Sequence, residues 1–140
     1  MAADSNNIGL VFRNMDNYQQ TLDYYNKALE IRTGLVERVC MARDYGNIGS
    51  IFSNIGNNQE ALEYHNKALA IHTGLNDRIG MVVDYARIGR MLKLLNKNDK
   101  AIESIEKGLN ILVDLENDTG YHHPLIETLK DLKKDLSWKA

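Results

Sequence analysis

The sequence predicts an all-α solenoid of three stacked helix pairs, closed by a C-terminal capping helix. Three observations predict this fold class: a repeat with a period of 40 residues, apolar residues at helical spacing inside each copy, and a final amphipathic segment outside the repeat. We expect copies at about 1–40, 41–80 and 81–120, each burying its apolar face against its neighbours, and one domain over 1–140. The clearest repeated triplets are Asn7-Ile8-Gly9, Asn47-Ile48-Gly49 and Arg87-Ile88-Gly89.

Each copy is expected to contain two helices separated by a short polar break. In the second copy, Ile48, Phe52 and Ile55 recur at spacings of four and three, which places them on one helical face. In the turn that leads into the third copy, Asn76 or Asp77 can cap the next helix. The predicted helices span 2–15, 18–34, 37–55, 58–74, 77–95 and 98–115, and the turns between copies are expected at 35–37 and 75–77.

A glycine recurs inside the first helix of every copy. Glycine in a helix interior costs about 1 kcal/mol relative to alanine, so three such positions predict close contacts between helices. The small residues expected to face Gly9, Gly49 and Gly89 across these contacts are Thr21, Ala61 and Ala101.

The last helix is expected at about 123–138, outside the repeat. The repeat stops after Asp118-Thr119-Gly120, and Pro124 suits the first turn of a helix. This helix has one apolar stripe, as expected for a cap over the end of a solenoid. The stripe comprises Leu125, Leu129, Leu132 and Leu136, and the lysines expected to face away from it are Lys130, Lys133, Lys134 and Lys139.

Composition excludes several classes of function. The formal net charge is -2 and the sequence pI is about 6.1, which disfavours nucleic-acid binding. No apolar run is long enough to span a bilayer, and the first residues lack the pattern of a signal peptide. Cys40 is the single cysteine and is expected to be reduced and partly buried, which together with these points favours a cytoplasmic protein.

No arrangement of residues typical of catalysis, metal binding or cofactor binding appears in the sequence. An aspartate recurs at one repeat position, Asp4, Asp44 and Asp84, which indicates a structural hydrogen bond rather than a unique catalytic acid. His65 occupies the position of Tyr25 in the first copy, so it is interpreted as a packing residue. His122-His123 is interpreted as a polar loop that leads into the last helix.

These residues resemble the tetratricopeptide repeat, and the matching positions in the second copy are Tyr45, Ile48-Gly49, Phe52, Gly56, Ala61 and Ala68. Segments 45–49 and 61–71 are most similar to a subclass with a period of 40 residues, found in G-protein-signalling modulators and close to kinesin light chains. The resemblance implies a right-handed solenoid whose first helices line a concave groove. That groove would bind an extended or helical peptide from another protein.

The groove positions implied by the resemblance carry five cations and no carboxylate. Guanidinium groups bind carboxylates, and asparagines hydrogen-bond to peptide backbones, so we expect an acidic segment with apolar anchors. The same residue types are also typical of a plain solvated helix face. Ala3 and Val83 belong to the same stripe, and the candidate binding residues are Asn7, Leu10, Arg13, Asn14, Arg43, Asn47, Ser50, Asn54, Arg87, Arg90, Lys93 and Leu94.

The sequence therefore predicts a non-catalytic adaptor for protein–protein interaction. The alternative is a regulatory or sensor segment of a larger multi-repeat protein. Chaperone-binding members of the family use a five-residue clamp for two carboxylates, of which only Asn47 and Arg87 have counterparts here, so chaperone tails are not expected as ligands. We expect a monomer with weak self-association at the first copy, and no cofactor, metal, nucleic acid or membrane as a partner.

Overall fold

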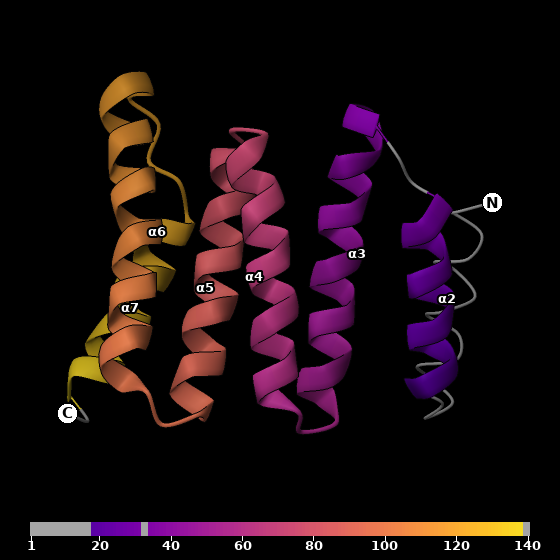
Figure 1. Ribbon diagram of the computed structural model, residues 1–140. Coiled ribbons are helices and arrows are strands. Elements are labelled where there is room, and N and C mark those ends of the chain that lie inside the picture. Colours follow the sequence, from indigo (N-terminus) through magenta and orange to yellow (C-terminus); the bar gives the residue numbers. More distant parts are fainter. Residues whose placement is uncertain (1–17, 32–33, 139–140) are drawn as a thin grey trace. The chain divides into compact units, whose positions relative to one another are not determined.

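The computed structural model of the chain describes residues 18–31 and 34–138 (Figure 1). The predicted helix 2–15 lies outside the described residues. Within them every regular element is helical. The helices are α2 (Tyr18–Ile31), α3 (Gly34–Asn54), α4 (Asn58–Gly74), α5 (Arg78–Leu94), α6 (Asn98–Thr119) and α7 (Leu125–Trp138).

The chain divides into two compact units, Met1–Ile71 and His72–Ala140. The described part of the first unit contains α2, α3 and most of α4. The second unit begins with the last residues of α4 and contains α5, α6 and α7. The assignment of 1–140 to one domain stays a prediction.

Three helices end in the same way, and this repetition explains why the breaks fall where the sequence predicts them. At the end of α3, the N–H of Asn57 donates to the carbonyl of Phe52 at 2.8 Å, and Gly56 has a positive φ of 86°. This is the Schellman termination, which requires a left-handed residue just after the helix. Asn76 and Asn96 adopt the same left-handed conformation after α4 and α5.

One predicted break and one predicted helix end are wrong. The break expected at 35–37 is helical, because α3 already begins at Gly34, whose φ of +86° lets the chain turn earlier. The helix expected to end at 115 continues to Thr119. It ends there because Gly120, with φ 75°, is the first residue after 115 to adopt the left-handed conformation; its N–H donates to the carbonyl of Glu116 at 2.7 Å.

The glycines of the first helices lie at close helix–helix contacts, as predicted for Gly49 and Gly89. A Cβ added at Gly49 would lie 2.8 Å from the ring of His65, and one at Gly89 would lie 2.8 Å from Cγ1 of Ile105. Ala61 and Ala101 are buried nearby on the second helices. The main residues opposite the glycines are nevertheless His65 and Ile105, which are large.

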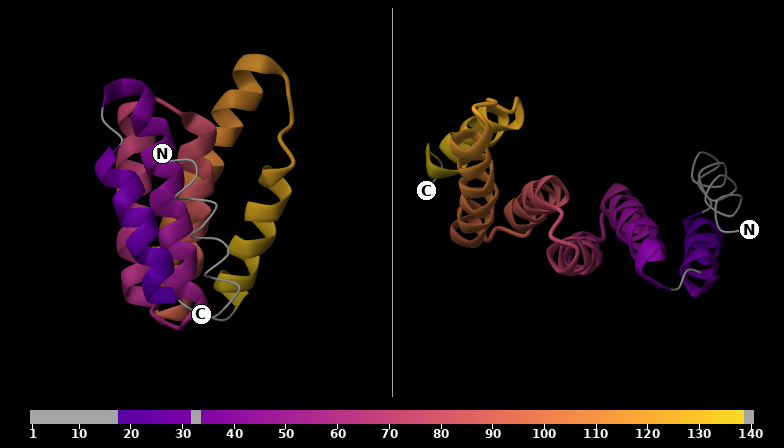
Figure 2. Two further views of the ribbon diagram at one scale, coloured as in Figure 1. Left: turned by 90° about the vertical axis from the view of Figure 1, so that its right-hand side faces the viewer. Right: turned by 90° about the horizontal axis from the view of Figure 1, so that it is seen from above.

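The capping helix α7 runs antiparallel to α6, since the connection after α6 turns back along it (Figure 2). Ile126, Leu129 and Leu136 are almost fully buried, whereas Leu125 and Leu132 are only partly buried. The predicted stripe is therefore wrong at its start, where Ile126 is buried in place of Leu125. The buried face of α7 runs from Ile126 through Leu129, three residues later, to Leu136, ten residues later. Lys133 does not face away: its Nζ lies 3.4 Å from Oε1 of Glu106 on α6.

Candidate functional site

The predicted binding residues of the second copy share one face of α3. Arg43, Asn47, Ser50 and Asn54 are spaced by four, three and four residues, which keeps them aligned along the helix. Arg43 and Asn54 are exposed, and Asn47 and Ser50 are partly buried. The hydroxyl of Ser50 donates to the carbonyl of Gly46 at 3.1 Å. Towards a ligand, this hydroxyl can therefore act only as a hydrogen-bond acceptor.

The opposite face of α3 is packed against α4. This packing determines which face of α3 remains exposed. Ile48 and Ile51 are fully buried. The ring of Tyr64 on α4 lies 5.4 Å from the ring of Phe52 and 5.9 Å from that of Tyr45, measured between centroids. These aromatic contacts show that Tyr45, Phe52 and Tyr64 pack α3 against α4.

The predicted residues of the third copy lie on α5, where Val83, Arg87, Arg90 and Leu94 repeat the spacing of four, three and four and Lys93 flanks them. Arg90 is exposed, Arg87 and Lys93 are partly buried, and Leu94 exposes 55% of its surface. An exposed leucine beside cations offers an apolar contact next to charge. This combination suits an acidic segment that also carries an apolar side chain.

The one carboxylate of α5 is removed from this face. Asp84 is buried and hydrogen-bonds with Nδ1 of His72, near the end of α4. Burial raises the pKa of Asp84, and the neighbouring His72 and Arg87 oppose that shift. The structural hydrogen bond predicted for the recurring aspartate is confirmed at this position.

The equivalent Asp44 of the second copy is fully buried, and its Oδ1 lies 3.8 Å from Nε of Arg43. The first member of the series, Asp4, lies outside the described residues. His65 is buried between helices, which confirms its interpretation as a packing residue, and Cys40 is partly buried as predicted.

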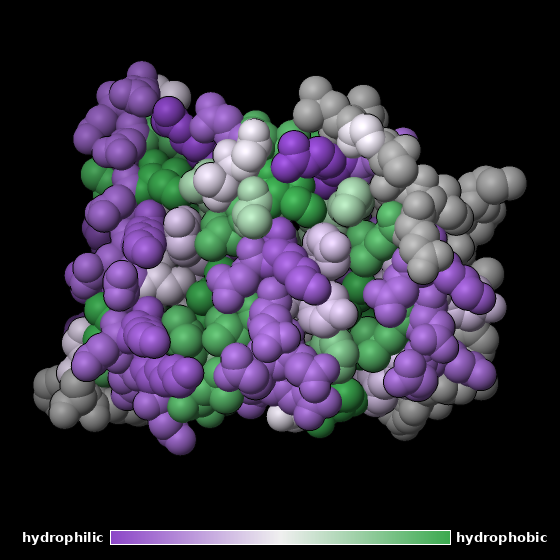
Figure 3. Space-filling view, in the orientation of Figure 1, coloured by the Kyte–Doolittle hydropathy of each residue, from purple (hydrophilic) through white to green (hydrophobic). Residues whose placement is uncertain are grey.

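Charge is separated between the two main helices of the second unit. Helix α5 contains four basic residues and one acidic residue, the buried Asp84, whereas α6 contains six acidic and two basic residues. The face of α6 turned to the viewer in Figure 3 is covered by hydrophilic side chains. The acidic excess of the chain in this unit is therefore carried by α6 and not by α5.

The remaining predicted site residues are Asn7, Leu10, Arg13 and Asn14, which lie outside the described residues. The α3 residues belong to the first unit and the α5 residues to the second, so each exposed face is described within its own unit.

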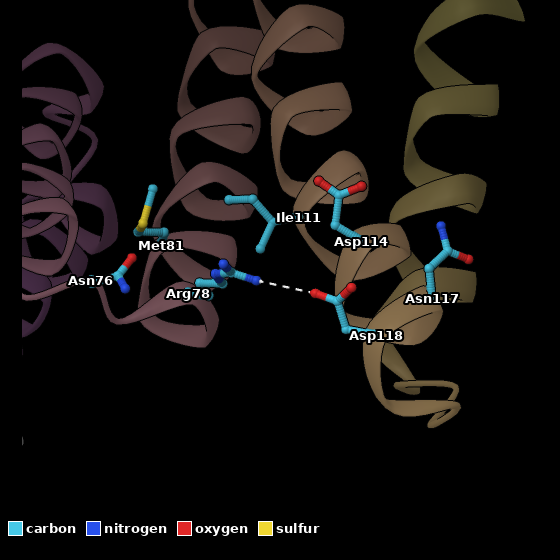
Figure 4. A pocket seen from close by; sticks show the side chains of 7 residues that line it. All are labelled: Asn76, Arg78, Met81, Ile111, Asp114, Asn117 and Asp118. Atoms are coloured by element: carbon cyan, nitrogen blue, oxygen red, sulfur yellow. Dashed lines mark ion pairs between the residues drawn. The ribbon is translucent and has the colours of Figure 1, made fainter.

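A hollow of about 390 Å³ between the start of α5 and the end of α6 was not predicted from the sequence (Figure 4). Two of its lining residues, Asn117 and Asp118, lie on the part of α6 that continues past the point where α4 ends in the second copy. The sequence did contain an indication that α6 is longer than α4. The second copy has Gly74, the last residue of α4, at the position where the third copy has Asp114. Its lining residues are Asn76, Arg78, Met81, Ile111, Asp114, Asn117 and Asp118.

The two histidines before α7 are loop residues, as interpreted from the sequence. Nδ1 of His122 lies 2.6 Å from Oε2 of Glu116, and its Nε2 lies 3.3 Å from Oε1 of Glu127, so this ring bridges α6 and α7. The N–H of Leu125 donates to Nδ1 of His123 at 3.1 Å. Over residues 18–31 and 34–138, no group of three or more potential ligands is arranged to hold a metal ion.

None of the helices in the described part of the chain combines the length and the apolar character that crossing a membrane requires.

A sequence model of the tetratricopeptide repeat family matches residues 1–74 and, in a second overlapping match, residues 41–112. No curated protein matches the chain by sequence.

Solved structures of similar fold cover almost the whole chain. The N-terminal domain of stress-induced protein-1 (STI-1) from C. elegans has a TM-score of 0.74 at 15% identity, covering 97% of this chain and 94% of that one. The apo form of RapI has a TM-score of 0.86 at 19% identity, with coverage of 99% and 37%. BtubC (BKLC) from P. vanneervenii has a TM-score of 0.74 at 23% identity, with coverage of 87% and 49%. These likenesses confirm the predicted fold class.

Proposed function

Because the chain belongs to the tetratricopeptide repeat family, we propose that it is a non-catalytic adaptor that binds an acidic segment of a partner protein. The binding residues are those of the exposed faces of α3 and α5, together with the equivalent positions Asn7, Leu10, Arg13 and Asn14 of the first copy. The family is typically a scaffold for protein–protein interaction, which supports the general function.

The observation that carries the preference for acidic ligands is the charge of α5. Among the described residues, Arg87, Arg90 and Lys93 form no ion pair within 4.0 Å, and the one carboxylate of α5, Asp84, is buried and hydrogen-bonded with His72, although Arg87 is close enough to oppose the rise of its pKa. Arginine and lysine in such a place can each form a charge-assisted hydrogen bond with a ligand carboxylate. The exposed Leu94 supports an apolar anchor next to these contacts.

The α3 face supplies polar contacts rather than a second cluster of charge. Asn47 and Asn54 can each donate to and accept from a peptide backbone, and Arg43 adds one cation. A segment bound to the α3 face would therefore be held mainly through its backbone, whereas the α5 face would bind acidic side chains. We further propose that the adaptor is a cytoplasmic monomer, which sedimentation at several concentrations would test.

The proposal is tested with an array of peptides that differ only in charge: acidic, neutral and basic versions of the same apolar framework. We expect binding to the acidic peptides, with an affinity that falls as salt concentration rises. Replacement of Arg90 by Gln should weaken this binding by about fivefold, the size expected for one exposed charge pair.

Lys100→Gln is the matched control, because Lys100 is exposed on α6 and its replacement changes the net charge equally. Equal losses in the two variants would show a general charge effect and not a binding face. A preference for the basic peptides would contradict the proposal outright.

A further inference from the structure

We propose that the hollow between the start of α5 and the end of α6 binds an arginine side chain of a partner protein. This inference does not depend on the acidic-segment site, because it uses other residues and a ligand of opposite charge. All of the residues that line the hollow belong to the second unit.

Negative charge gathers at the end of α6, next to the hollow. The last turns of α6 contain Asp114, Glu116 and Asp118 and its final turn has no basic residue, although a helix C-terminus already has a negative potential. Arg78 is the first residue of α5, where the helix N-terminus disfavours a cation. Asp118 is paired with Arg78, and Glu116 is paired with His122, so Asp114 is the carboxylate of these turns that has no ion pair within 4.0 Å in the described part of the chain.

The net electrostatic character of the hollow is negative. Nη1 of Arg78 lies 3.8 Å from Oδ2 of Asp118, as the dashed line in Figure 4 shows, so these two charges offset each other. Among the described residues, Asp114 has no ion pair within 4.0 Å, and it adds its charge to the potential of the α6 C-terminus. The hollow therefore favours a cation beside Asp114.

The shape and lining of the hollow fit a guanidinium on a long apolar stem. Met81 and Ile111 supply apolar surface along which the methylene groups can lie. The carboxylate of Asp114 can accept two parallel hydrogen bonds from a guanidinium, and Asn76 and Asn117 lie at opposite ends of the hollow in Figure 4. A volume of about 390 Å³ is large enough to admit one inserted side chain.

The hollow includes a part of α6 that departs from the repeat. Helix α4 ends at Gly74, and the corresponding position of α6 is Asp114, from which that helix continues for five more residues to Thr119. The lining residues Asn117 and Asp118 lie on this continuation, which starts directly after Asp114. The site is therefore a departure from the repeat and not one of its shared features.

The experiment follows backbone amide NMR signals of the full chain during titration with N-acetyl-arginine amide, with N-acetyl-citrulline amide as the neutral isostere. We expect saturable shifts at Asn76 and Asn117 with the arginine probe and none with the citrulline probe. Asp114→Asn should raise the dissociation constant about tenfold, the loss expected for a hydrogen-bonded charge. Asp131→Asn, an exposed aspartate on α7, is the control and should leave binding unchanged.

Arg78→Gln should change the affinity for the arginine probe in the opposite direction to Asp114→Asn. It therefore distinguishes an effect on binding from damage to the fold. It releases Asp118 from its ion pair and should tighten binding of the arginine probe by about threefold. Shifts that do not saturate, equal shifts with citrulline, equal losses in Asp114→Asn and Asp131→Asn, or weaker binding by Arg78→Gln would each overturn the proposal.

Discussion

Replacement of Gly89 by Ala tests whether α5 and α6 approach as closely as the structure shows. The added Cβ would lie 2.8 Å from Cγ1 of Ile105, 3.1 Å from its Cδ1 and 3.4 Å from the carbonyl oxygen of Ala101. Carbon atoms at optimal contact are about 3.5–4.0 Å apart, so the nearest contact is a clash. Ile105 is fully buried and branched at Cβ, and the third neighbour is backbone, so little room exists for relaxation.

Two opposing effects set the magnitude. Alanine in a helix is favoured over glycine by about 1 kcal/mol. Overpacking of a well-filled contact costs about 1–3 kcal/mol, and both Ile105 and the α6 backbone must move here, which places the cost near the upper end. We therefore expect Gly89→Ala to lower the free energy of unfolding by about 1–2 kcal/mol, with a fall in Tm of roughly 3–8 °C.

Urea denaturation followed by circular dichroism measures this change, and a double-mutant cycle assigns its cause. In a chain that already carries Ile105→Ala, the clashing atoms are absent, so Gly89→Ala should instead raise stability by about 1 kcal/mol. Ala70→Gly on the exposed face of α4 measures the propensity effect alone and should destabilise by about 1 kcal/mol. A stabilising effect of Gly89→Ala in the wild-type chain would refute the close approach of these helices.

Two further predictions concern the second unit. His72→Leu removes the hydrogen-bond partner of buried Asp84 and should cost about 3 kcal/mol at neutral pH. Burial raises the pKa of Asp84 in the folded chain, so this group favours folding at low pH and loses that contribution as pH rises through its folded pKa. His72→Leu should raise that pKa further and steepen the loss of stability with pH; denaturation curves whose pH dependence matches wild type would contradict this account. Leu129→Ala on α7 should cost about 3 kcal/mol because Leu129 is almost fully buried, whereas Lys133→Ala, which breaks the half-exposed pair with Glu106, should cost less than about 1 kcal/mol. A larger loss for Lys133→Ala than for Leu129→Ala in thermal denaturation would show that charge rather than packing holds the cap.

The sequence predicted the helices of this chain because helical periodicity and turn residues are local properties. The breaks after α3, α4 and α5 follow from Gly56, Asn76 and Asn96, each of which adopts the left-handed conformation that ends a helix. Asp77 was expected as a possible cap, and its Oδ1 accepts from the N–H of Gly80 at 3.0 Å. The limit of α6 was missed because the repeat was expected to end its helix in every copy alike.

The candidate binding residues could be placed on helix faces from spacing alone, and their exposure on α3 and α5 agrees with that placement. The hollow beside Asp114 could not be predicted in this way. It depends on residues about forty positions apart in the sequence, Arg78 and Asp118, whose side chains meet only when α5 and α6 pack side by side.

The sequence by itself determined the 40-residue period, the pairing of helices and the family to which the chain belongs, since each is written in local patterns that recur. The tertiary structure alone decided which side chains meet: His65 opposite Gly49, His72 with Asp84, and Ile126 in the core in place of Leu125. The physical reason is that spacing defines a helix face only to within about one residue, or 100° of rotation. The exact contact depends on how each helix is turned and shifted against its neighbour, which only the packed side chains determine.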